Sequence, residues 1–141
     1  MLSGIVIALV AGAVGFYLGT YAQSNALAVS DWYISLRQGA LVDFERTRGS
    51  DSDYETALRR YIALLDELEG RKSPELSGST YLVDKSFALI RLSRLLERRG
   101  DQVEAAQTAT MASEVCAKAN RRDCSVATLV EITTKLDERS F

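Results

Sequence analysis

Hydrophobic and polar positions divide the chain into one long apolar run followed by a series of amphipathic segments. Residues 1–22 contain no Asp, Glu, Lys, Arg, Asn or Gln. A helix of this length rises about 33 Å, which is enough to cross a hydrocarbon core of about 30 Å. The pattern therefore predicts a transmembrane anchor over residues 1–23.

Small residues recur every four positions within this run, a spacing that lets a second helix approach closely in lipid. The candidates for transmembrane helix packing form two rows: Gly4, Ala8 and Gly12 in one, and Ala11, Gly15 and Gly19 in the other. Two alternatives stay open, a signal peptide cleaved at 26–28 and a buried helix of a soluble domain. The length of the run and the absence of Lys or Arg before Arg37 favour the anchor over a signal peptide.

The next segment has the apolar period of a helix. Five apolar residues are spaced by three or four positions and so share one helical face: Val29, Tyr33, Leu36, Ala40 and Phe44. This spacing predicts a juxtamembrane amphipathic helix over residues 24–48. Gly49 and the polar residues after it interrupt the pattern, and a helical domain is expected over residues 49–141.

Apolar stripes bounded by start and stop signals predict four helices in this domain, over about 52–70, 80–99, 101–119 and 124–137. Ser52 and Glu55 have the spacing of a capping box, and Asp101 and Glu104 repeat the signal. Residues 70–79 hold the single proline and are predicted to be a loop. Val and Ile do not alternate with polar residues here, so the predicted fold class is all-α.

The strongest local pattern spans residues 89–117. It combines Leu92 and Ser93, a turn at Gly100, and small residues at Ala105 and Ala112. The pattern resembles one tetratricopeptide repeat over about residues 86–119, a hairpin of two antiparallel helices. The resemblance implies a surface that binds a partner. The expected architecture is thus a single transmembrane helix followed by a small helical-hairpin domain, either tetratricopeptide-like or a generic bundle.

Two cysteines are placed to bridge the turn between the last two predicted helices. Cys116 falls in the last turn of one helix and Cys124 in the first turn of the next. A disulfide between them would close a short loop and would indicate an oxidising compartment. Two buried free thiols are the alternative.

Charge is distributed in blocks, although the net charge is only −2. Residues 31–69 carry nine acids and five bases, whereas residues 70–122 carry six acids and ten bases. The second block contains a candidate partner surface formed by Arg91, Arg94, Arg98, Arg99, Arg121 and Arg122. Two interpretations stay open: solvated faces that neutralise acids elsewhere in the domain, and a surface that docks an acidic protein.

The chain offers little for chemistry. It has no histidine, which excludes histidine-based triads and the commonest zinc sites. The acids at Asp51, Asp53 and Glu55 lack the glycine and the final acid of a calcium loop. No catalytic, cofactor-binding or metal-ligating residue is therefore assigned, and neither an enzyme, a cofactor nor a nucleic-acid partner is expected.

These observations predict a single-pass protein of the cell inner membrane whose helical domain lies in the periplasm and binds another protein as an adaptor or scaffold. One alternative is a membrane-anchored inhibitor or immunity protein, whose acidic block 43–69 would meet a basic toxin or enzyme. Another is an accessory subunit of a larger membrane complex, assembled through its transmembrane helix. The lipid bilayer, a second copy of the chain and a partner transmembrane helix are further expected partners.

Overall fold

The computed structural model describes residue 20, residues 30–31, 33–47, 49–70 and 79–139, and all of its regular elements in these ranges are helices. The N-terminal helical segment comprises residues 30–31 and 33–47. Four helices follow: α2 (Asp51–Gly70), α3 (Ser79–Arg99), α4 (Gln102–Lys118) and α5 (Val126–Arg139). The all-α prediction is confirmed for these residues.

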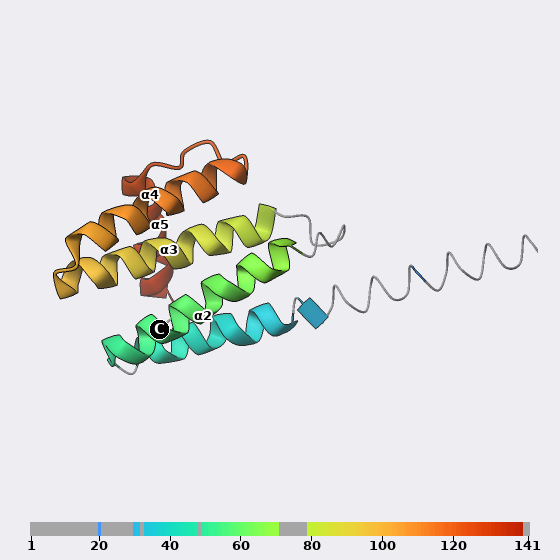
Figure 1. The fold of residues 1–141 in the computed structure, drawn as a ribbon, viewed down its shortest axis with the longest axis horizontal. Helices are drawn as coiled ribbons and strands as arrows, with labels where there is room; N and C mark the ends of the chain where they lie inside the picture. The colour runs from blue at the N-terminus through green and yellow to red at the C-terminus, as the bar shows by residue number, and fades with distance from the viewer. Residues whose placement is uncertain (1–19, 21–29, 32, 48, 71–78, 140–141) are drawn as a thin grey trace, which may run out of the picture.

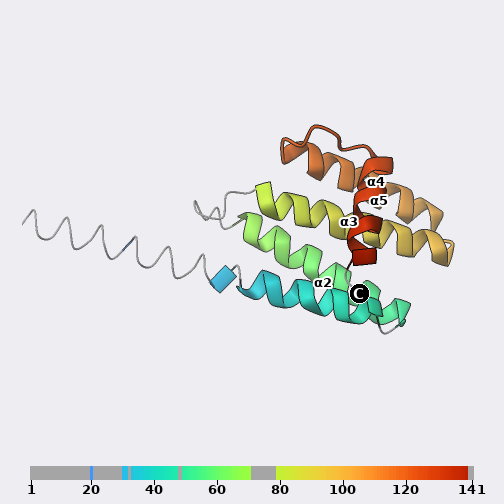
Figure 2. The same cartoon turned by 180° about the vertical axis from the view of Figure 1, so that it is seen from behind.

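The helices are arranged around α3 (Figure 1). Helices α2 and α4 pack on opposite sides of α3, and the N-terminal helical segment lies along α2. Helix α5 runs across α3 rather than along it, as the reverse view shows (Figure 2). Leu95 and Leu96 of α3 pack in a cluster with Leu58 of α2, and Ile90 of α3 packs in a second cluster with Leu129 of α5. Burial of α3 by its neighbours therefore forms most of the core.

The turn between α3 and α4 begins at Gly100, where the sequence places it. Gly100 has φ +91°, and its amide donates to the carbonyl of Glu97. The next amide, of Asp101, reaches back to the carbonyl of Leu96, which completes a Schellman ending of α3. Beyond the turn, the Ser93 hydroxyl donates to the carbonyl of Ala105 at 2.8 Å. Small side chains at these positions let the two helices approach closely.

Two predicted helix starts differ in detail. Ser50, not Ser52, caps α2, because the amide of Asp53 donates to the Ser50 hydroxyl. Asp101 precedes α4, but its side chain makes no capping hydrogen bond. The carboxylates of Glu55 and Glu104 instead accept hydrogen bonds from Arg59. Ion pairs within α2 and between α2 and α4 have replaced local capping, so both predicted capping boxes are wrong.

The predicted disulfide is present between Cys116 and Cys124, whose Cα atoms are 5.5 Å apart. It closes the turn from α4 to α5. Asn120 in this turn has φ +55°, a left-handed conformation that Asn tolerates better than most residues. The Ser113 hydroxyl also donates to the carbonyl of Cys124 at 2.7 Å. The covalent bond and this hydrogen bond together hold the start of α5 against the end of α4.

The predicted fold class needs one correction. Within the described ranges, every helix is too short or too charged to cross a bilayer. The physical reason is that these helices are amphipathic, with charged side chains on their outer faces. The predicted transmembrane helix over residues 1–23 is therefore not supported. Apart from Thr20, its residues lie outside the described ranges, including the rows Gly4, Ala8, Gly12 and Ala11, Gly15, Gly19.

Truncating the centre of the core tests the packing. We expect Leu95→Ala to lower the free energy of unfolding by roughly 2–5 kcal/mol, because Leu95 is fully buried against α2 and α4. Val103→Ala is the control, since Val103 is three-quarters exposed and should change stability by less than about 0.5 kcal/mol. Denaturant unfolding followed by circular dichroism measures both. Equal effects of the two substitutions would contradict the burial of α3.

Removing the disulfide should weaken the domain without unfolding it. We expect the double variant Cys116→Ala, Cys124→Ala to lose about 2.5 kcal/mol, because a loop of about nine residues is no longer closed in the unfolded chain. The same denaturant titration in the presence of reductant should bring the wild type to a similar midpoint. A wild-type midpoint that reductant leaves unmoved would argue against the disulfide.

Candidate functional site

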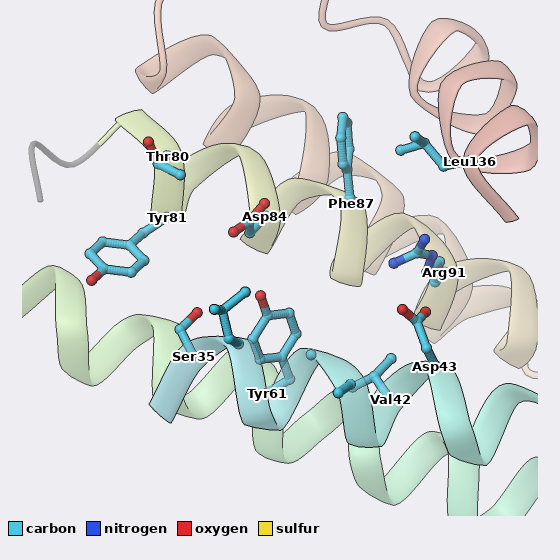
Figure 3. A pocket seen from close by; sticks show the side chains of 13 residues that line it. Ser35, Val42, Asp43, Tyr61, Thr80, Tyr81, Asp84, Phe87, Arg91 and Leu136 are labelled. Carbon is cyan, nitrogen blue, oxygen red and sulfur yellow. The ribbon is translucent and has the colours of Figure 1, made fainter. Parts of the chain in front are cut away.

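A groove of about 670 Å³ opens on the surface of the described domain. It lies between the N-terminal helical segment, α2, α3 and α5 (Figure 3). One wall carries Ser35, Leu36, Gly39, Ala40, Val42 and Asp43, and α3 supplies Thr80, Tyr81, Asp84, Phe87 and Arg91 to the opposite wall. Tyr61 of α2 and Leu136 of α5 complete it. The groove thus joins residues from four elements.

Exposed apolar side chains concentrate on the helical segment that borders this groove. The described residues contain nine large hydrophobic side chains that are exposed, and five of them lie here: Tyr33, Ile34, Leu36, Leu41 and Phe44. The side packed against the domain instead carries Val42 together with the polar Asp31 and Ser35. The predicted helix is therefore amphipathic, but its apolar stripe faces outward. Contiguous exposed apolar surface of this kind marks interaction sites.

Asp84 is the one acid on the α3 wall of the groove. Among the described residues, no hydrogen bond or ion pair is recorded for its carboxylate. Burial raises the pKa of Asp84, and the positive charge of Arg91 opposes this only in part. A half-buried carboxylate without a partner is destabilising, because its lost hydration is not replaced.

Tyr61 faces this carboxylate from α2. In Figure 3 its hydroxyl points toward α3, where Asp84 lies. Ser35 of the N-terminal helical segment lines the groove with Tyr61. Burial raises the pKa of Tyr61 and the charge of Asp84 raises it further, whereas the Ser35 hydroxyl acts to lower it. The middle of the groove therefore brings together two hydroxyl groups and a carboxylate from three different helices.

A charged network closes the α5 end of the groove. Asp137 accepts hydrogen bonds from Arg91 at 2.6 and 3.0 Å, and its backbone carbonyl accepts one from Arg46 at 3.3 Å. Arg46 also pairs with Asp43 at 3.7 Å. Tyr54 lies beneath this network, and its burial raises its pKa to about 12. The network joins the N-terminal helical segment, α3 and α5, so it fixes the width of the groove at this end.

The six arginines predicted as a partner surface do not form one surface. Arg91 and Arg94 bind Asp137 and Thr134 of α5. Arg98 pairs with Asp51 at 3.4 Å, and Arg99 pairs with Glu55. Arg121 and Arg122 are exposed in the turn before α5, and Arg121 borders a separate hollow of about 300 Å³ that Asp84 also lines. Four of the six therefore take part in contacts within the domain.

The acidic block is likewise neutralised in part by contacts between helices. Lys85 of α3 binds Asp66 and Glu69 of α2. Glu55 accepts hydrogen bonds from Arg59 and Arg99. These pairs explain why opposite charge blocks occur along a chain that is almost neutral overall.

The groove itself was not recognised in the sequence. One face of α3 carries a row of residues spaced by three or four positions. The row consists of Asp84, Phe87, Arg91, Arg94 and Arg98. The position of Asp84, a single acid at the start of a row of arginines, was the feature of the sequence that could have pointed to the groove. In the sequence Tyr61 belongs to the apolar stripe of residues 52–70, and its place beside Ser35 in the groove depends on how two helices pack.

Metal chemistry has no visible basis in the described part of the chain, where no three acidic or cysteine side chains come together as ligands. The chain matches no protein-family model, no curated protein and no solved structure. Functional inference for this domain therefore rests on the groove and its lining.

Stability should depend on pH through Asp84. Its raised folded pKa makes the ionised carboxyl destabilising, a penalty that is absent below the ordinary pKa of 3.8 and grows as pH rises toward the folded value. Asp84→Asn should therefore raise the melting temperature at pH 7, with the gain shrinking toward pH 3. Thermal unfolding across this pH range measures the difference from the wild type.

Glu55 provides the control, because its carboxyl has a lowered pKa whereas that of Asp84 is raised. Hydrogen bonding by Arg59 lowers the pKa of Glu55, so its ionised form stabilises the fold above its ordinary pKa of 4.5. Glu55→Gln should lower the melting temperature at pH 7, and this loss should fade as the pH falls. If both variants changed stability in the same direction, the unpaired state of Asp84 would be disproved.

Proposed function

We propose that this chain is a non-enzymatic protein-binding module that receives a segment of another protein in the groove and along the N-terminal helical segment. The observation that carries the proposal is the exposed apolar stripe on residues 33–44 beside a groove of about 670 Å³. Protein interfaces bury apolar and aromatic side chains at their centre and leave charged groups at the rim. The stripe and its surroundings have this composition.

The extent of the surface favours a polypeptide over a small molecule. Leu36 and Ala40 line the groove, whereas Tyr33, Leu41 and Phe44 are exposed outside it. The stripe runs about 16 Å along the helix at 1.5 Å per residue. A partner helix of about three turns would cover it, as in the known mode where an amphipathic helix fills an apolar groove.

The lining supports binding rather than catalysis. The polar groups in the middle of the groove are one carboxylate and two hydroxyls, and the chain has no histidine to act as a general base at neutral pH. A membrane anchor is not part of this proposal. Five of the eight acids in the 43–69 block pair with Arg46, Arg59, Arg98, Arg99 or Lys85, so fewer of them are available to an inhibitor acting through that block.

Site-specific photo-crosslinking tests the proposal. The full chain, carrying benzoylphenylalanine at position 36 or at position 103, is expressed in the cells that produce it and irradiated. We expect a discrete protein adduct from position 36 and none from position 103, because both residues are exposed but only Leu36 borders the groove. Mass spectrometry of the adduct identifies the crosslinked segment of the partner.

A substitution at the stripe provides the matched comparison. With the crosslinker at position 40, Phe44→Gln should reduce the adduct at least several-fold while the melting temperature changes little, since Phe44 is half exposed. Val103→Gln, an equivalent exposed change on α4, should leave the adduct intact. Adducts of equal yield from positions 36 and 103, or an adduct indifferent to Phe44→Gln, would refute binding at this surface.

A further inference from the structure

Asp84 is an unusual residue for the wall of an apolar groove. It lies on α3 between Tyr81, which is buried, and Phe87, which is partly buried. Burial normally selects against a carboxylate unless it is paired, because the charge loses its hydration. The domain therefore keeps a destabilising group on the wall of this groove, and a bound partner is one way to satisfy it.

Neither of the two arginines near Asp84 binds its carboxylate among the described contacts. Arg91 lies on the same helix, but its guanidinium is bound to Asp137 of α5. Arg121 of the turn before α5 borders the separate hollow of about 300 Å³, and no pairing between it and Asp84 is recorded in the described residues. From α2, the side chain facing Asp84 is the neutral hydroxyl of Tyr61. Among the described residues, therefore, no side chain occupies the Asp84 carboxylate, and it can accept a cation from a bound segment.

The surroundings of Asp84 suit a cation on an aliphatic stem. Rings of Tyr61, Tyr81 and Phe87 line the same groove, and aromatic faces attract ammonium and guanidinium groups. Leu36 and Val42 supply apolar surface on the opposite wall. Lys and Arg bury their methylene stems against such surface while the charged head meets a carboxylate.

We propose that the groove recognises a Lys or Arg side chain of the bound protein segment, with the cationic head against the Asp84 carboxylate and the stem between Leu36 and Phe87. This inference rests on the proposed protein-binding function and names the feature of the segment that is read. Apolar residues flanking the basic residue would cover the stripe. The site would reject a neutral or acidic residue at this position, because the carboxylate would then stay buried and unpaired.

The test uses the purified full chain and a phage-displayed library of random 12-residue peptides as the probe. We expect the wild type to enrich peptides that carry Lys or Arg next to apolar residues. The most enriched peptide is then synthesised in two forms, with arginine or with citrulline, its neutral near-isostere, at the basic position. The arginine form should bind the wild type about 10- to 100-fold more tightly, as expected for a charged hydrogen-bonded pair.

Two variants test whether Asp84 is responsible for the discrimination between the arginine and citrulline peptides. Asp84→Asn should abolish the discrimination between arginine and citrulline while keeping a folded domain, since an unpaired charge is removed. Glu114→Gln removes one negative charge from an exposed site on α4 and should preserve the discrimination. Circular dichroism checks that both variants are folded.

The outcomes separate this inference from the proposed function. Enrichment of basic peptides by the wild type and Glu114→Gln, but not by Asp84→Asn, supports the recognition of a basic side chain. Enrichment of apolar peptides without basic residues, with binding weakened by Leu36→Gln, overturns the role of Asp84 and leaves the groove as a protein-binding site. Failure to enrich any peptide, or binding indifferent to both Leu36→Gln and Asp84→Asn, overturns both.

Discussion

Burial of α3 is the constraint on which the rest of the domain depends. Its residues contribute to every core cluster of the described helices, and α2, α4 and α5 each pack against it. Ile90 and Leu95 are completely buried, so α3 must be apolar on several sides rather than on one stripe. The remaining polar row, from Asp84 to Arg98, is where α5 and the N-terminal helical segment approach.

The groove follows from how α5 crosses this row. Thr134 and Asp137 of α5 bind Arg94 and Arg91, which lie toward the C-terminal half of α3. Asp84 stands seven residues before Arg91, about 10 Å farther along the helix. A crossing helix covers only part of the row, so the N-terminal part of α3 borders open space. The way in which α5 crosses α3 therefore explains two features. It places the ion pairs at one end of the groove, and it leaves the Asp84 carboxylate in the middle uncovered.

The arrangement of the helices also explains why acidic and basic residues occur in separate blocks along the sequence. Acids of α2 meet bases of α3 at Lys85, Arg98 and Arg99, and Arg59 of α2 reaches Glu104 of α4. Exposed pairs of this kind contribute little stability each, typically below about 1 kcal/mol. Their main effect is to pair charges of opposite sign across neighbouring helices. The proposed recognition accordingly relies on the apolar stripe and on the Asp84 carboxylate rather than on a charged face.

The sequence by itself determined the helical class and the turn at Gly100, because helix periodicity and turn residues are local properties. It placed Cys116 and Cys124 close enough to bridge the turn but left two free thiols as the alternative, and the structure joins the two cysteines. The sequence misassigned both capping boxes, because the carboxylates of Glu55 and Glu104 bind Arg59 instead of the amides at the helix starts. Only the tertiary structure decided that Tyr33, Leu36 and Phe44 face outward, and that Ser35, Tyr61 and Asp84 meet. An apolar stripe shows that a helix has two faces, but which face is covered depends on contacts between elements distant in the chain.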